Sequence, residues 1–203
     1  MSSSQEVFNL LNKKFDTRKL VTCAILTALV IVLQAMGAFI RFGTFSVSLV
    51  LVPIVIGAAV CGIWTGAWLG FVFSVVVLFT DAGAFLAISV PGTIITVILK
   101  GTLAGLAAGI VYLALEKVNK YLACVVAAIC APIVNTGIFL IGCRLFFYET
   151  IKGWAEGAGF ASAGAFMIVG LVGTNFLVEM AINIILSPTI LRLVNLGKKS
   201  VNR

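Results

Sequence analysis

The sequence of 203 residues contains no histidine and very little charge, since only 10% of its residues are Asp, Glu, Lys or Arg. Without histidine, every catalytic scheme that uses an imidazole base is excluded, and most metal sites lose their commonest ligand. Soluble domains carry about 25% charged residues, so the shortage of charge argues against a soluble fold. The hydrophobic share of 62% indicates a polytopic membrane protein instead.

Several sequence motifs of enzymes are also missing. No GxxxxGK[ST] occurs, which excludes ATP binding through a P-loop, and HExxH and GxSxG are absent as well. The five cysteines lie in or beside apolar runs without CxxC spacing, a pattern typical of small buried side chains and not of disulfides or metal ligands. We therefore expect no enzymatic activity, no cofactor and no metal site.

The net charge of +7 does not predict nucleic-acid binding, because the basic residues stand at the ends of apolar segments. In a membrane protein such residues set the orientation, since loops rich in Lys and Arg stay in the cytoplasm. Most of them lie in the N-terminal segment, in the turn at 116–120 and at the C-terminus. The opposite loops hold only Arg41, Arg144 and Lys152, which predicts that both termini are cytoplasmic.

The apolar runs predict an all-α integral membrane protein, a bundle of six transmembrane helices over residues 20–193. An even number of spans agrees with the expectation that both termini lie on the same side. The expected helices cover residues 20–40, 45–62, 66–80 (after a very short connection at 62–66), 91–115, 121–143 and 165–193.

The segments outside these helices are short. We expect residues 1–19 to form a cytoplasmic segment with a short helix on the membrane surface, and residues 194–203 to form a basic cytoplasmic tail. Residues 144–164 carry charges among aromatic side chains, which predicts an amphipathic loop or short helix at the outer surface, a candidate lid. Pro53 and Pro132 fall inside predicted helices, and Pro53 predicts a kink or a broken turn.

Lys100 lies in the middle of an apolar run, at residues 91–110, that is long enough to cross a bilayer. A charge at that position costs at least ~2.5 kcal/mol, so it requires a partner or a function. At 1.5 Å per residue, Lys100 lies ~14 Å below the outer end of its helix. Asn135 and Asn175 lie at a similar depth on their own helices, and Glu179 shares a helix face with Asn175.

These polar residues, together with Gln34 somewhat higher on the first helix, predict a pocket open to the outside. Arg144 is expected at its mouth. A fixed cation and several amides suit a small polar ligand, and the two basic residues favour a carboxylate. The candidate substrate-binding residues are therefore Lys100, Asn135, Asn175, Glu179, Gln34 and Arg144.

Two other interpretations of the same residues stay open. Lys100 and Glu179 would also fit a structural ion pair, or the proton-coupled pair of a self-sufficient secondary transporter. The asparagines would equally bond helix to helix in a membrane scaffold that binds no ligand, at about 0.6 kcal/mol each.

Two series of glycines recur at every fourth residue and predict close packing of helix backbones. One series is Gly101, Gly105 and Gly109, on the cytoplasmic side of Lys100, and the other starts at Gly62 and continues to Gly70. A helix face without side chains lets a neighbouring backbone approach closely. We expect this packing to seal the floor of the pocket.

The chain resembles the substrate-binding S components of energy-coupling-factor (ECF) vitamin transporters. The resemblance rests on Ala24-Ile-Leu-Thr-Ala28 in the first helix, on the Pro53-Ile-Val-Ile-Gly57 stretch with the glycines that follow it, and on the outer pocket. It implies a subunit in a bacterial cell membrane that captures a vitamin outside and topples in the membrane to release it inside. It also implies two kinds of partner, a transmembrane T component and two cytoplasmic ATPases, with Ala24 and Ala28 contacting the T component.

Within that family the sequence is most similar to the group that contains pantothenate, folate and riboflavin binders. Lys100 and Arg144 would fit the carboxylate of pantothenate, although folate carries carboxylates too. Pantothenate is the ligand expected on this resemblance.

Overall fold

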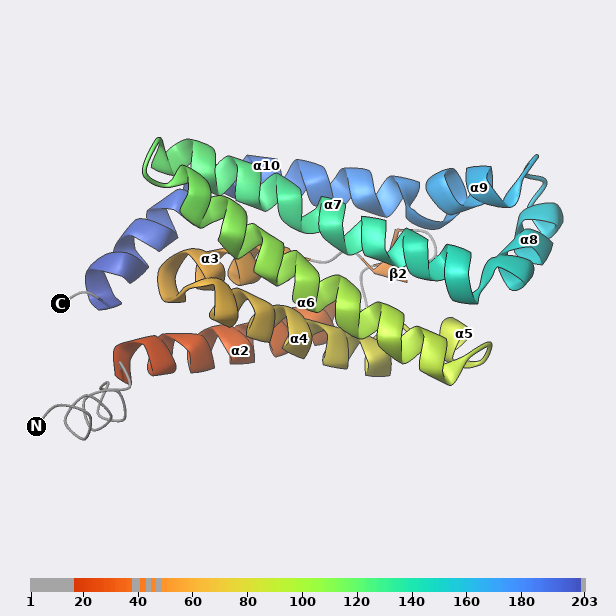
Figure 1. The fold of residues 1–203 in the computed structure, drawn as a ribbon, viewed down its shortest axis with the longest axis horizontal. Helices are drawn as coiled ribbons and strands as arrows, with labels where there is room; N and C mark the ends of the chain where they lie inside the picture. Colours follow the sequence, from red (N-terminus) through yellow and green to blue (C-terminus); the bar gives the residue numbers. More distant parts are fainter. Residues whose placement is uncertain (1–16, 38–40, 43–44, 47–48, 202–203) are drawn as a thin grey trace, which may run out of the picture.

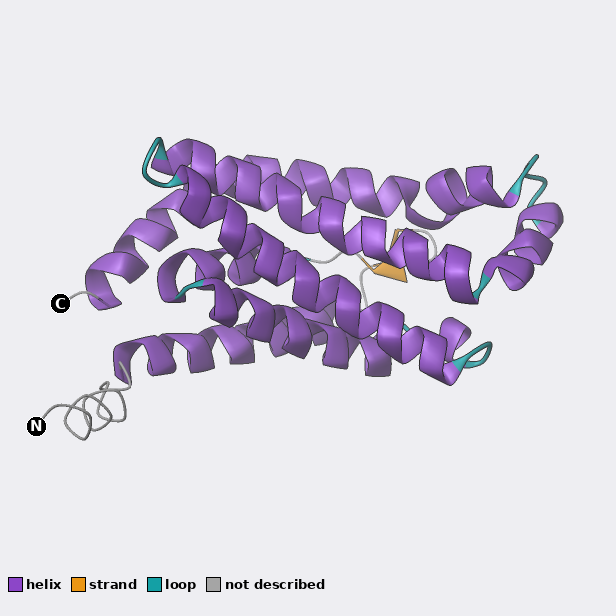
Figure 2. Cartoon of the chain, viewed as in Figure 1, coloured by secondary structure: helices purple, strands orange, loops and turns teal. Residues whose placement is uncertain are grey.

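A computed structural model describes residues 17–37, 41–42, 45–46 and 49–201 of the chain. The described part is helical except for one short hairpin (Figure 2). In chain order the elements are α2 (Thr17–Gly37), β1 (Arg41–Phe42), β2 (Phe45–Ser46), α3 (Leu51–Cys61), α4 (Ile63–Thr80), α5 (Gly83–Leu86), α6 (Val90–Leu115), α7 (Lys120–Phe146), α8 (Tyr148–Gly157), α9 (Ala163–Ala165), the π-helix η1 (Phe166–Gly173) and α10 (Thr174–Val201).

Five helices (α2, α4, α6, α7 and α10) are long and apolar enough to cross a membrane, and they confirm five of the predicted spans. Local signals fix where two of them begin. The Ser89 side chain accepts a hydrogen bond from the backbone N–H of Gly92 at the start of α6, where Pro91 occupies the first turn. At the start of α7, Asn119 accepts hydrogen bonds from the backbone of Tyr121 and Leu122.

The second predicted span is the one that differs. Instead of a helix over 45–62, a two-residue antiparallel hairpin pairs β1 with β2, and α3 begins only at Leu51. Pro53 therefore lies in the first turn of α3 and does not kink a longer helix, because proline has no N–H to donate and is tolerated where the first turn leaves that donor unpaired. At 11 residues, α3 is about 16 Å long, too short to cross a bilayer alone.

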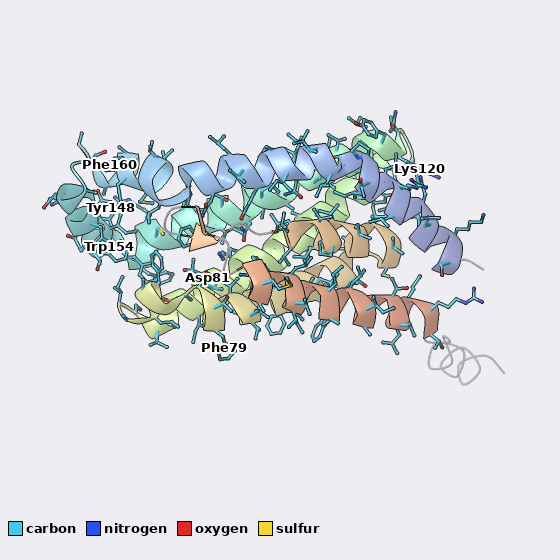
Figure 3. All side chains as sticks on the ribbon, turned by 180° about the vertical axis from the view of Figure 1, so that it is seen from behind. Phe79, Asp81, Lys120, Tyr148, Trp154 and Phe160 are labelled. Atoms are coloured by element: carbon cyan, nitrogen blue, oxygen red, sulfur yellow. The ribbon has the colours of Figure 1, made fainter. Side chains whose placement is uncertain are left out.

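Figure 1 shows that the two ends of the described chain lie at one end of the bundle, and that α5 and α8 lie at the other. The helix α8 confirms the short amphipathic helix predicted within 144–164. It is held to the bundle by Phe85 of α5, whose ring packs edge-on against Phe139, Phe147 and Trp154 at centroid distances of 5.0–5.8 Å. In Figure 3, Trp154 lies at the opposite end of the molecule from Lys120.

The last predicted span, over 165–193, begins as the π-helix η1 and ends later than predicted. It continues past the expected end at Leu193 to Val201, so most of the predicted 194–203 tail is helical. Lys198 in this extension forms an ion pair with Glu116 in the turn between α6 and α7, and its ammonium lies 4.7 Å from the ring centroid of Tyr112. These contacts fix the extension to the bundle. The helix predicted within residues 1–19 falls almost wholly outside the described residues.

The two glycine series pack against each other. In the antiparallel pair α4 and α6, Gly66 lies opposite Gly105 and Gly70 lies opposite Gly101, each glycine against the other's backbone carbonyl. No side chain separates the two helices at these points, which allows their backbones to touch, as predicted. This contact lies between Lys100 and the end of the bundle that holds both ends of the described chain, the end that is predicted to be cytoplasmic.

Replacing Gly105 by alanine is expected to lower the free energy of unfolding by about 1–3 kcal/mol, the usual effect of overpacking, and therefore to lower the melting temperature. The added methyl group would collide with the carbonyl of Gly66. Gly137→Ala on α7 is the matched control, because a methyl group there meets nothing within 4 Å and the change in helix propensity is the same. Melting of the two purified variants in detergent compares them. Equal melting temperatures would contradict the close packing.

Candidate functional site

One cavity collects most of the polar side chains of the membrane domain. The empty space among its lining atoms, including the space at its open side, is about 540 Å³. Its wall comes from α2, α4 and the residue after it, α6, α7, η1 and α10. The lining residues are Gln34, Phe73, Val77, Asp81, Lys100, Asn135, Thr136, Phe139, Val172, Asn175, Phe176 and Glu179.

The cavity brings together five of the six residues predicted to bind substrate. Lys100 enters it from the middle of α6, Asn135 from α7, and Gln34 from the last turns of α2. Asn175 and Glu179 enter from the first turns of α10, one helical turn apart on the same face. Gln34 lies near the end of α2, and Asp81 lies between the end of α4 and α5, so the cavity lies toward the end of the bundle that carries α5 and α8.

Lys100 is surrounded by opposite charge. The carboxylates of Glu179 and Asp81 act on its ammonium, with Glu179 the stronger of the two. The ammonium also lies 5.2 Å from the ring centroid of Phe139, close enough for a cation–π interaction. The lysine therefore has the partners that a cation in a membrane interior requires.

Asp81 is the residue that the sequence analysis missed. It follows the last residue of α4, and its carboxylate accepts a hydrogen bond of 2.9 Å from the side-chain amide of Gln34 and one of 3.1 Å from the hydroxyl of Thr80. The bond to Gln34 connects α2 to the end of α4 across the cavity wall. The available signal was a carboxylate directly after an apolar run, which was interpreted as a loop residue.

The two asparagines present buried oxygen atoms to the cavity. The side-chain oxygens of Asn135 and Asn175 have no hydrogen-bond partner among the described residues, although both side chains are more than 90% buried. A buried acceptor without a donor is costly, so these atoms require a donor from a ligand or from water. Their position favours a binding role over a simple helix-to-helix bond.

Arg144 does not belong to the cavity, contrary to the prediction. It is exposed near the end of α7, and its guanidinium stacks on the ring of Tyr148 at 3.9 Å from the centroid. The physical reason is helix phase: Arg144 follows Asn135 by nine residues, or about two and a half turns of 3.6 residues, which places it on the opposite face of α7.

The helix α2 presents its predicted docking residues outward. Leu26, Val30 and Gln34 are buried at four-residue spacing, whereas Ala24 and Ala28 are exposed. The two series are offset by two residues, so they occupy opposite faces of the helix. The small-residue face is thus available to lipid or to a partner.

A comparison with known protein families identifies the family of this chain. The description "ECF transporter, substrate-specific component" matches residues 18–191, most of the sequence. The chain belongs to this family. It is accordingly a membrane-embedded, substrate-binding subunit of a transporter, a class of proteins that are not enzymes.

A solved structure supports the same fold for this substrate-specific component. The structure of ThiT from Listeria monocytogenes superimposes with a TM-score of 0.61 at 22% sequence identity, covering 87% of this chain and 96% of that one. At this identity the likeness concerns the fold alone. No curated protein sequence matches the chain significantly.

Within the described residues, no group of three or more His, Cys, Asp or Glu side chains could hold a metal ion.

Proposed function

We propose that the chain captures a small vitamin-like molecule from outside the cell and delivers it inward as part of an ATP-driven importer in a bacterial cell membrane. The observation that carries this proposal is the cavity itself. Lys100, Asn135, Asn175 and Glu179 converge there from three helices, in the half of the bundle that is predicted to face outward. A binding site confined to one half fits capture from one side and not a continuous pore.

The energy for transport would come from partner subunits. The sequence has no P-loop, so a transmembrane T component and two cytoplasmic ATPases would supply ATP hydrolysis. The exposed face with Ala24 and Ala28 suits the T component, because small residues allow a partner helix to approach closely.

The first test identifies the bound molecule. Mass spectrometry of extracts from the purified protein is expected to detect one small polar compound in near-stoichiometric amount. A matched preparation of the Asn135→Leu/Asn175→Leu variant is expected to lack it, because both buried acceptors are removed. A folded protein that neither carries nor binds a small molecule would contradict the proposal and favour a membrane scaffold.

Uptake in cells separates the importer from a secondary transporter. The opposed charges of Lys100 and Glu179 on one cavity keep the secondary transporter as the second candidate, with this pair coupled to protons. Uptake of the identified compound is expected to stop when the partner ATPases are deleted. Uptake that persists in that strain, but responds to a proton uncoupler, would favour the second candidate.

A further inference from the structure

An apolar groove lies behind one wall of the cavity, between α7 and the first part of the last span. The empty space among its lining atoms, including the space at its open side, is about 1220 Å³. Among the described residues that line it, only Thr136 has a polar side chain. Ile168, Val169 and Leu177, which also line it, are largely exposed. Since these are membrane-spanning segments, the groove faces the hydrocarbon interior of the bilayer.

Three residues belong to both the cavity and the groove. Thr136 of α7, Val172 of η1 and Phe176 of α10 line the polar cavity on one side and the apolar groove on the other. The partition between the two spaces is therefore one layer of side chains. Asn135 and Asn175, whose buried oxygens have no hydrogen-bond partner among the described residues, directly precede Thr136 and Phe176 in the chain. The buried acceptors of the cavity thus lie next to this partition.

Little packing holds the partition closed. It includes the end of η1, a π-helix of eight residues, and helices of this rare kind occur frequently at functional sites. The helix α7 packs extensively against α6 but makes little contact with η1. Gly137 and Gly173 line the groove without side chains, and a methyl group added at Gly137 would meet nothing within 4 Å. The side chains of the partition can therefore move with little loss of contact.

Building on the function proposed above, we propose that the captured compound is amphipathic, with a compact polar head in the cavity and an apolar group that passes through the partition into the groove. The head donates hydrogen bonds to the oxygens of Asn135 and Asn175, which a buried acceptor requires. The apolar group leaves water for the apolar groove, which strengthens binding about fourfold for each buried methylene. The three shared residues favour this occupant over a bilayer lipid, because a lipid chain would need no polar cavity behind the groove.

The test compares two monoacylglycerols that share one head and differ in their apolar chain. Both 1-acetylglycerol and 1-octanoylglycerol offer two hydroxyl donors. Their binding to the full-length chain in phosphatidylcholine nanodiscs is followed by isothermal titration calorimetry, with empty nanodiscs as the blank. The octanoyl compound is expected to bind at least ~tenfold more tightly. Equal affinities would overturn the proposal and leave the groove as a surface for bilayer lipid only.

A variant that fills the groove provides the second readout. Gly137→Leu places a side chain in the open space of the groove and leaves the lining of the cavity unchanged. It is expected to reduce the ratio of octanoyl affinity to acetyl affinity at least ~fivefold. Gly153→Leu is the matched control at an exposed glycine of α8, where an added methyl group also meets nothing within 4 Å, and is expected to keep the ratio. Because the ratio is taken within one variant, partial loss of folded protein does not alter it. An unchanged ratio in Gly137→Leu would overturn the proposal.

The co-purified compound decides the matter if neither monoacylglycerol binds. It is expected to carry an apolar group of at least ~six carbons, and Gly137→Leu is expected to lower its occupancy at least ~fivefold. A compound without such a group, or an occupancy unchanged in Gly137→Leu, would overturn the amphipathic ligand and leave the importer intact. A folded chain that binds neither probe and carries no compound would instead overturn the proposed function.

Discussion

Replacing Lys100 by methionine is expected to lower the free energy of unfolding by about 3–5 kcal/mol, the loss typical of removing one member of a buried pair of opposite charges. Methionine keeps most of the length of the lysine stem, so the change removes charge more than volume. The carboxylates of Glu179 and Asp81 would then face the cavity without the ammonium that acts on them now. Thermal unfolding in detergent measures the loss.

A second substitution separates the charge effect from a packing effect. Lys100→Met/Glu179→Gln is expected to recover most of the lost stability, because the number of positive and negative charges falls together. Lys152→Met removes an exposed lysine from α8 and is expected to be neutral. No recovery in the double variant would indicate that Lys100 is required for its packing and not for its charge.

The double variant also decides between the structural and the binding interpretation of the ion pair. If Lys100 and Glu179 contact the ligand, the stable double variant is expected to bind the co-purified molecule at least ~tenfold more weakly than the unmodified chain, since each lost charged contact contributes about 1.5–3 kcal/mol. Unchanged affinity in a stable protein would assign the pair to folding alone.

The sequence predicted the site well wherever helix geometry alone determines position. Lys100, Asn135 and Asn175 were placed at one depth by a rise of 1.5 Å per residue, and the structure brings all three to one cavity. Glu179 followed from its spacing of four residues from Asn175. The glycine series likewise predicted close packing, although the sequence did not say that Gly66 and Gly105 would lie opposite each other.

Prediction failed where a residue's direction, and not its depth, decides the outcome. Arg144 has the right depth for a pocket mouth, yet half a turn of helix phase turns it away from Asn135. Asp81 lies just beyond the last residue of α4, where helical periodicity no longer indicates which way a side chain points, and only the tertiary contact with Gln34 reveals its direction. The start of α3 was placed too early, because a hydrophobic run indicates burial and does not distinguish a helix from a short hairpin.

Replacing Ala24 or Ala28 by tryptophan is expected to abolish assembly with a T component while leaving ligand affinity unchanged. Both alanines lie on the exposed face of α2, opposite the face that holds Gln34 in the cavity wall. An indole on that face would keep a partner helix from approaching, because the contact depends on small residues. It would not reach the cavity, so binding of the co-purified molecule should persist.

The control and the contrary outcome follow from the same geometry. Ala181→Trp makes the same substitution at an exposed alanine of α10 and is expected to leave assembly intact. Pull-down of the T component and ATPases, together with calorimetry on the same preparations, measures assembly and binding separately. Loss of ligand binding in Ala24→Trp would show that α2 shapes the cavity instead of docking a partner. Normal assembly of that variant would move the interface to another face of the bundle, because a tryptophan cannot be accommodated in a contact between closely packed helix backbones.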